Sequence, residues 1–253
     1  MTDTVRIARD GNVTTLTIAR PERRNALDAA TAEALALAIE EAGASARAVI
    51  VTGDGDAFCA GGDLEELERW SELDPEAIAS ALYGSFQRMI RGIRSAGAVF
   101  IAAVNGAAVG AGMDLALACD LRVAAEKARF GQVWVRLGVI PGTGGAWLTQ
   151  ELVGRTKAAE LLLTGDLITA SEALDIGLVN AVVPGERVID EARALAARIL
   201  RNPREGVAAN KRAISAAGAA ALEAALAHAA EVQPGRFTSE EFKAAVRTAR
   251  ESS

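Results

Sequence analysis

The sequence predicts an α/β fold built from repeated ββα units and followed by a C-terminal helical segment. Short apolar runs that favour β-strands occur at 48–52 and 99–104, and each is followed by a small-residue loop and a helical pattern. This recurrence, with a spacing of about fifty residues, favours stacked ββα units over a doubly wound sheet. Beyond residue 142, helical patterns dominate.

The first half of the chain predicts a hairpin, two buried strands and the helices between them. Residues 5–19 alternate in polarity around the turn at 10–12, which is typical of a β-hairpin. A charged loop follows, and Asp28 is a suitable N-cap for a helix that runs towards Gly43. The apolar strands at 48–52 and 99–104 suit central positions in a parallel sheet. Helices are expected from Asp63, from Asp74 to Arg94 and from Gly110, and a strand at 121–124.

The stretch 95–113 is uncharged and nearly long enough to span a bilayer, and it contains Gly106-x-x-x-Gly110. The turn signal Asn105-Gly106 divides it, and residues 99–101 favour a strand. We therefore expect a buried strand, a turn and a helix here, and no membrane association.

The C-terminal part predicts helices with a single strand among them. Helical patterns occur at 143–153, 157–163 and 171–176, and a strand is expected at 179–183. A soft boundary near Asn202 divides the chain into an α/β core, residues 1–202, and a helical segment, residues 203–253. The amphipathic helices of this segment are expected to pack on the main domain or on another subunit.

Composition and missing motifs exclude several functions. A net charge of −6 argues against a nucleic-acid partner, and Cys59, Cys119 and His228 do not make a metal-ligand cluster. Without an apolar signal core at the N-terminus, we expect a cytoplasmic protein with reduced thiols. The chain has no P-loop, no complete dinucleotide fingerprint and no G-x-S-x-G elbow. His228 is interpreted as a surface helix residue.

Two small-residue loops carry the main functional signal. Residues 60–64 (AGGDL) and 110–114 (GAGMD) each follow an apolar run and open a predicted helix. Backbone N–H groups at a helix start lack intrahelical acceptors and can hold a negatively charged oxygen. Two such starts that face one point would form an oxyanion hole. The alternative is that the small residues only permit tight turns between strand and helix.

Six stretches in order resemble the crotonase (enoyl-CoA hydratase/isomerase) superfamily. They are residues 20–27 (RPERRNAL), 58–64 (FCAGGDL), 105–112 (NGAAVGAG), 120–124 (DLRVA), 130–132 (FGQ) and 138–145 (GVIPGTGG). The resemblance covers nearly the whole chain and implies a crotonase-like spiral of ββα repeats. It implies an enzyme that binds an acyl-CoA thioester, with coenzyme A as part of the substrate and no separate cofactor or metal. It also implies a homotrimer or a dimer of trimers.

The resemblance assigns roles by position. The N–H groups of Ala60 and Ala111 are expected to form the oxyanion hole, and Arg24 to lie near the adenine and phosphates of coenzyme A, unless it is an ordinary surface arginine. Asp63 is expected to fix its loop rather than react. The other residues expected to contact substrate are Ala26, Gly62, Leu64, Gly110 and Trp134.

One departure from the family pattern bears on the reaction. The resemblance implies that hydratases of this family use two glutamates for general acid–base catalysis. Here the first of these positions is Asp114 and the second is Trp134, whose indole cannot exchange a proton. Asp114 then remains as a single carboxylate base, or as a structural carboxylate at a helix start. Trp134 either shapes an acyl pocket or belongs to the core. Glu65, Glu66 and Glu68 could supply a replacement acid or lie solvated on their helix.

Three functions remain open at this point. The first is enolate chemistry on an acyl-CoA, of the hydratase or isomerase type. The second is an acyl-CoA binding protein without catalysis on the same fold, and the third is an oligomeric scaffold with a vestigial pocket. Binding of thioesters and exchange of their α-protons distinguish the three.

Overall fold

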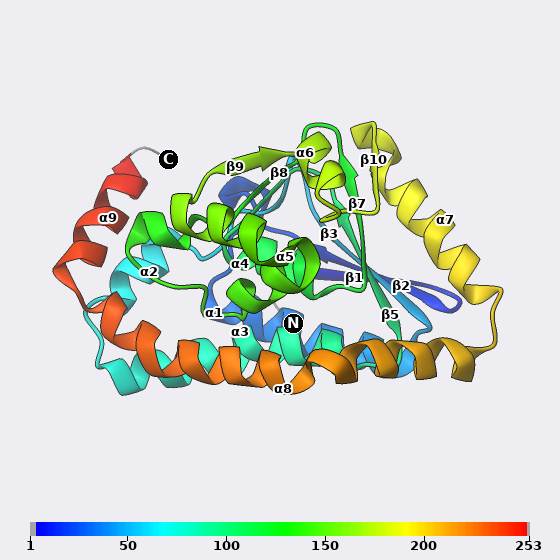
Figure 1. Ribbon diagram of the computed structural model, residues 1–253, viewed down its shortest axis with the longest axis horizontal. Helices are drawn as coiled ribbons and strands as arrows, with labels where there is room; N and C mark the ends of the chain where they lie inside the picture. Colours follow the sequence, from blue (N-terminus) through cyan, green and yellow to red (C-terminus); the bar gives the residue numbers. More distant parts are fainter. Residues whose placement is uncertain (1–3, 252–253) are drawn as a thin grey trace.

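The computed structural model describes residues 4–251, and its strands form two sheets (Figure 1). The larger sheet has six strands in the order β1-β2-β3-β5-β7-β10, and the smaller has four in the order β4-β6-β8-β9. The strands of the larger sheet are β1 (Val5–Asp10), β2 (Val13–Ile18), β3 (Ala48–Gly53), β5 (Val99–Val104), β7 (Leu121–Ala125) and β10 (Ala181–Val183). Those of the smaller sheet are β4 (Ala57–Cys59), β6 (Ala107–Val109), β8 (Arg129–Gly131) and β9 (Leu167–Thr169).

The helices follow the strands as the repeat predicts. They are α1 (Ala29–Ser45), α2 (Leu64–Trp70), α3 (Pro75–Ser95), α4 (Ala111–Ala118), α5 (Gly145–Thr164), α6 (Ala170–Asp175), α7 (Val188–Leu200), α8 (Arg204–Phe237) and α9 (Glu240–Glu251). Three short 3₁₀ helices are η1 (Pro21–Arg23), η2 (Val133–Leu137) and η3 (Gly185–Arg187).

Consecutive strand pairs confirm the ββα repeat. The pairs β3–β4, β5–β6 and β7–β8 each place their first strand in the larger sheet and their second in the smaller one. Neighbouring first strands are parallel, as are β4, β6 and β8. Each repeat therefore advances one strand in both sheets at once, and the loops that follow β4 and β6 end up side by side.

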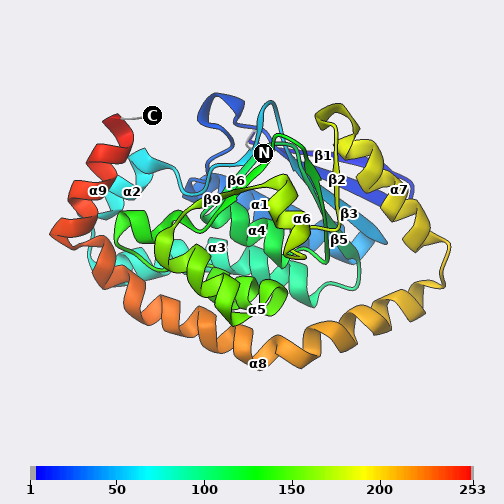
Figure 2. The same cartoon turned by 45° about the horizontal axis from the view of Figure 1, so that its top comes forward.

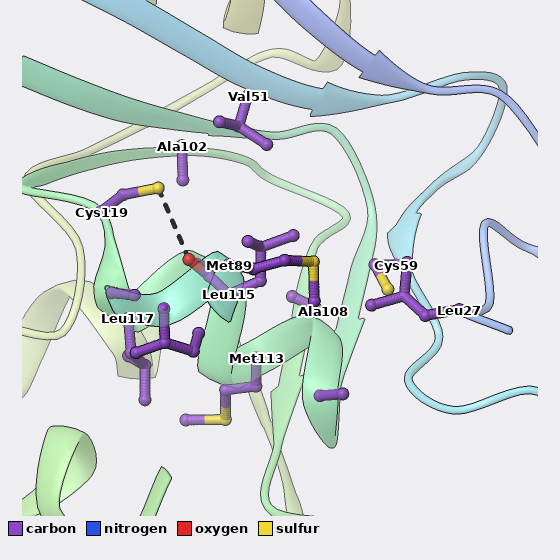
Figure 3. Close-up of a cluster of buried hydrophobic side chains, with 14 of the residues drawn as sticks. Leu27, Val51, Cys59, Met89, Ala102, Ala108, Met113, Leu115, Leu117 and Cys119 are labelled. Carbon is purple, nitrogen blue, oxygen red and sulfur yellow. Dashed lines mark hydrogen bonds between the residues drawn. The ribbon is translucent and has the colours of Figure 1, made fainter. Parts of the chain in front are cut away.

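The central strands are buried on both faces, which explains their unbroken apolar sequences. Ile50 and Ile101 pack against Ala192 and Ala196 of α7. Alternate residues of the same strands belong to the main core with α1, α3 and α4. Figure 2 shows α7 on the outer side of the larger sheet. Figure 3 shows side chains of the main core around α4, including both cysteines, which are free and buried.

Several predicted boundaries are corrected. The two helices expected between 143 and 163 form α5, interrupted at Gly154, whose φ of 75° is non-helical. The strand expected at 179–183 starts at Ala181, because the Asn180 side chain accepts a hydrogen bond from the Arg122 N–H at 2.8 Å. The three-residue strands of the smaller sheet are too short to leave an alternating pattern. In the uncharged stretch 95–113, the expected strand and helix are β5 and the start of α4, and a second short strand, β6, that was not expected lies between them.

The helical segment after residue 202 wraps around its own core. Helix α8 runs along α3 and α5, and α9 ends beside α2 (Figures 1 and 2). The buried Lys211 ammonium donates to the carbonyls of Ile93 and Ala98 at 2.8 and 2.7 Å and pairs with Asp120 at 2.8 Å. Among helices within residues 4–251, only α8 has the length and apolar composition to cross a membrane, and 17% of its most apolar 18-residue window is buried.

We expect Lys211→Met to lower the free energy of unfolding by about 3 kcal/mol, because it leaves two carbonyls and a carboxylate without their donor. Urea unfolding followed by circular dichroism measures the change. Lys157→Met is the control, because Lys157 forms an exposed pair with Glu160 and its loss should cost less than about 0.5 kcal/mol. Equal stability of the two variants would contradict the anchoring role of Lys211.

Candidate active site

The loops that follow β4 and β6 touch each other through glycines. A Cβ atom at Gly112 would lie 2.1 Å from the Cys59 carbonyl oxygen, and one at Gly61 would lie 2.8 Å from the Val109 oxygen. Gly61 also has a φ of 98°, which side chains disfavour. The contact therefore requires glycine on both loops, and it brings the starts of α2 and α4 together.

Ala60 does not supply a free amide to this site. Its N–H donates to the Arg24 carbonyl at 3.0 Å, so the expected oxyanion role of Ala60 is wrong. Gly62, two residues after Ala60, lies in a short bridge to Leu27. Leu27 donates to the Gly61 carbonyl at 2.7 Å, and Asp63 donates to the Leu27 carbonyl at 2.9 Å. The two hydrogen bonds of this parallel bridge are made by Gly61 and Asp63, so neither of them involves the N–H of Gly62.

The Gly62 N–H consequently points away from the bridge, and Gly62 lines an internal cavity. Ala111, the first residue of α4, lines the same cavity. Within the part of the chain that the structure describes, neither the Gly62 N–H nor the Ala111 N–H has a hydrogen-bond acceptor. The cavity therefore has two unpaired backbone donors, one from each loop.

The rest of the cavity is mainly aromatic and draws on distant parts of the chain. Its volume is about 20 Å³, which is room for one water molecule. Trp70 lies edge-to-face with Phe86 and with Phe237, at ring-centroid distances of 6.0 and 6.2 Å. An acyl chain can enter only when these side chains move apart. The lining residues are Gly62, Leu67, Trp70, Tyr83, Phe86, Ala111, Trp134, Gly142, Thr143, Gln233 and Phe237.

Asp114 is fully buried behind the cavity rather than exposed in it. The Thr143 hydroxyl donates to its Oδ2 atom at 2.5 Å, and Gln132 Nε2 donates to its Oδ1 atom at 2.8 Å. The Gly145 N–H, at the start of α5, also donates to it. Burial raises the pKa of Asp114 to about 6, although these three donors oppose the increase. Thr143 lines the cavity and so connects the carboxylate with it.

Gln132 is held in turn by the neighbouring helix. Its Nε2 atom also donates to the Thr149 hydroxyl at 3.0 Å, and that hydroxyl donates to the Gly145 carbonyl at 2.6 Å. This chain of hydrogen bonds fixes the carboxylate between α4 and α5.

Trp134, in η2, lies against the start of α4. A Cβ atom at Gly110 would lie 3.7 Å from the Cε2 atom of Trp134, next to the indole nitrogen. The side chain is 9% exposed, and its Nε1 atom is buried without an acceptor among the described residues. Trp134 is thus nearly buried, as a core residue would be, and it also lines the cavity.

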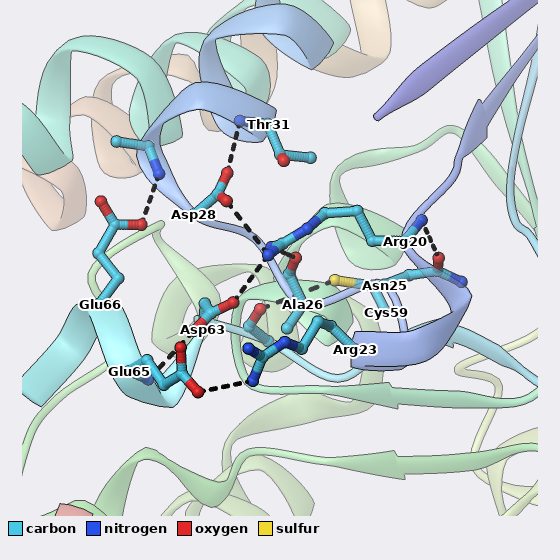
Figure 4. A network of polar contacts seen from close by, with 12 residues as sticks. Arg20, Arg23, Asn25, Ala26, Asp28, Thr31, Cys59, Asp63, Glu65 and Glu66 are labelled. Carbon is cyan, nitrogen blue, oxygen red and sulfur yellow. Dashed lines mark hydrogen bonds and ion pairs between the residues drawn. The ribbon is translucent and has the colours of Figure 1, made fainter. Parts of the chain in front are cut away.

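Asp63 belongs to a polar network that holds the first loop (Figure 4). Its carboxylate caps α2 by accepting from the Glu65 N–H at 3.1 Å, and it pairs with Arg20 at 3.0 Å. Arg20 also pairs with Asp28 and donates to the Ala26 carbonyl at 2.6 Å. Asp63 and Ala26 therefore fix the loop and do not line the cavity.

The other predicted residues lie around this network. Arg24 is exposed, and Leu64 is half-buried outside the cavity lining. Glu65 pairs with Arg23, Glu66 accepts from the Ala29 N–H, and Glu68 pairs with Arg250, so these glutamates point away from the cavity. Sequence reasoning missed Thr143 and the aromatic lining. A hydroxyl within the motif at 138–145 was the available signal for Thr143.

Comparison with known proteins gives the class that this fold and cavity define. Residues 8–252 match the family model described as "Enoyl-CoA hydratase/isomerase". The chain belongs to the enoyl-CoA hydratase/isomerase family, a family of enzymes on the crotonase fold. A probable enoyl-CoA hydratase of Rhodobacter capsulatus is 36% identical over 96% of this chain and 93% of its own length.

Two further relatives extend the comparison. The 2,3-dehydroadipyl-CoA hydratase of Escherichia coli is 36% identical over 87% of this chain and 85% of its own length. The crystal structure of an enoyl-CoA hydratase/isomerase from Mycobacterium paratuberculosis matches with a TM-score of 0.91 at 29% identity, over 98% of this chain and 99% of that one. The predicted family and fold class are both confirmed.

We expect Gly145→Ala to lower the free energy of unfolding by about 3 kcal/mol. The added Cβ would lie 1.9 Å from the Asp114 Oδ1 atom and would force α4 and α5 apart. Thermal unfolding measures the loss. The control Gly206→Ala has no heavy atom within 4 Å of its new Cβ and lies in α8, so its stability should be unchanged or slightly higher. A Gly145→Ala protein as stable as this control would contradict the described packing of Asp114.

Proposed function

We propose that this protein is an acyl-CoA enzyme that stabilises the enolate of a thioester between the N–H groups of Gly62 and Ala111. The observation that carries the proposal is the presence of two unpaired backbone donors in one cavity. Donors fixed in place before the reaction, in a cavity from which water is excluded, strongly stabilise developing negative charge. A thioester carbonyl becomes such an oxygen when a proton leaves the adjacent carbon.

Asp114 is the proposed base, and Thr143 connects it with the substrate. The Thr143 oxygen takes the proton from the carbon next to the thioester, while the hydroxyl proton moves to Asp114. The carbon–hydrogen electron pair forms the enolate, whose charge lies on the oxygen between the two amides. In a 3-enoyl thioester, return of the proton to the second carbon of the acyl chain gives exchange, and its delivery to the fourth carbon gives isomerisation. A pKa of about 6 suits a base that works near neutral pH.

Proton transfer by one carboxylate is favoured over hydration by a glutamate pair. Among the described residues, none of those that line the cavity carries a carboxylate, and Trp134 occupies the second family position. We expect the exposed Arg24 to contact the phosphates of coenzyme A, which enters as part of the substrate. We further propose a cytoplasmic homotrimer or dimer of trimers that uses the outer face of α8, where Ile214 is 67% exposed.

We expect the protein to exchange the α-protons of 3-butenoyl-CoA in D₂O. Asp114→Asn and Thr143→Val should each slow this exchange by about 100-fold or more, because each breaks the proton path. Thr143→Ser keeps the hydroxyl and should retain most of the rate. Proton NMR of the thioester follows the exchange, and calorimetry measures binding.

Results other than exchange of the α-protons would favour one of the two other functions. Tight binding of the thioester without exchange would favour an acyl-CoA binding protein that lacks catalysis. No binding would favour a scaffold. Unchanged exchange in Asp114→Asn would contradict the proposed base.

The exchange rate should depend on the protonation of Asp114. A base acts only when it is deprotonated, so the rate should be constant well above pH 6 and fall as the pH drops through about 6. Gln132→Leu removes a donor that lowers the pKa of this carboxyl, so the midpoint should move to higher pH. A rate that stays constant from about pH 5 to 8 would show that another group, or no titrating group, limits the reaction.

A further inference from the structure

We propose that the indole N–H of Trp134 donates a hydrogen bond to an oxygen on the third carbon of the bound acyl group. The preferred ligands would then be 3-oxoacyl-CoA or 3-hydroxyacyl-CoA thioesters rather than unsubstituted acyl-CoA thioesters. This inference rests on the proposed function, because it takes the thioester oxygen to lie between Gly62 and Ala111.

The indole nitrogen is a buried donor that the described residues leave without an acceptor. Such a group loses its hydrogen bonds to water and gains none in return, which destabilises the protein. Two other buried polar atoms share this condition, Thr31 Oγ1 and Gln132 Oε1, but neither residue lines the cavity. Trp134 does line it. An acceptor that enters the cavity would therefore satisfy this donor.

Three other polar side chains of the cavity are already occupied. The Tyr83 hydroxyl donates to Gln233 Oε1 at 2.9 Å, and Gln233 Nε2 donates to the Ile140 carbonyl at 2.7 Å. The Thr143 hydroxyl donates to Asp114. The remaining lining side chains, from Leu67, Trp70, Phe86 and Phe237, are apolar or aromatic. The two indoles are the side-chain donors left for an acceptor of the ligand, and of these only the Trp134 nitrogen is fully buried among the described residues.

The position of the indole selects the carbon that carries this oxygen. The Cε2 and Cζ2 atoms of Trp134 lie against Gly110, which immediately precedes Ala111. We place the thioester oxygen on the Ala111 amide and the second carbon next to Thr143, and in this arrangement we assign the third carbon to the neighbourhood of the indole. Because the indole N–H only donates, it positions an acceptor oxygen and does not exchange a proton with it.

Binding of two thioesters of equal chain length tests this inference. We expect the wild-type protein to bind acetoacetyl-CoA about tenfold more tightly than butyryl-CoA, as one satisfied buried donor implies. Trp134→Phe should remove this preference. Trp70→Phe changes an indole in the same cavity and should keep it. Isothermal titration calorimetry supplies the three pairs of dissociation constants that these comparisons need.

A second variant separates the hydrogen bond from the shape of the ring. In the double variant Trp70→Phe, Trp147→Phe, Trp134 is the one remaining tryptophan. It can then be replaced specifically by β-(3-benzothienyl)alanine, which has sulfur in place of the indole N–H. Loss of the preference in this protein supports the inference. A preference retained there, or in Trp134→Phe, would overturn it. Equal binding of both thioesters by the wild type would overturn this inference alone, whereas no binding of either would overturn the proposed function as well.

Discussion

The contact between the loops after β4 and β6 is the constraint on which the site depends. Gly112 lies so close to the Cys59 carbonyl that any side chain there would overlap it, and Gly61 is packed almost as closely against Val109. The two loops belong to consecutive ββα repeats, and the pairing of β4 with β6 holds them in register. Glycine at these positions therefore lets the two loops meet at one cavity, which is lined by two backbone N–H groups without acceptors among the described residues.

The positions of the other groups follow from this contact. Once the start of α4 is fixed, Asp114 points one turn later into the gap between α4 and α5, where Gly145 leaves room for its carboxylate. The start of α5 then brings Thr143 to the cavity wall. Burial without a cationic partner gives this carboxylate its raised pKa, and three hydrogen bonds limit the increase. The result is a carboxyl group that ionises near neutral pH.

Much of this architecture could be predicted from local sequence. The strands at 48–53 and 99–104, the helix starts at the two loops and the C-terminal helices all leave clear local patterns. The donor in the first loop could not be assigned in this way. Whether Ala60 or Gly62 keeps a free N–H depends on hydrogen bonds to Arg24 and Leu27, which lie about 35 residues away in the chain and leave no trace in the loop itself.

The same limit applies to the cavity wall and to the base. Phe237 reaches the cavity because α8 wraps around α3 and α5, which is a tertiary contact rather than a local signal. Asp114 was identified as a candidate base, but its position behind Thr143 depends on how closely α5 approaches α4. Long-range packing therefore decides the details of this chemistry, whereas local sequence decides the framework.

The position of the thioester oxygen tests the account most directly. A crystal structure of the complex with butyryl-CoA would locate it. We predict that this oxygen lies about 2.7–3.1 Å from the backbone nitrogens of both Gly62 and Ala111, as expected for an oxyanion hole. An oxygen that contacts only one of these nitrogens, or that lies outside this cavity, would contradict the account.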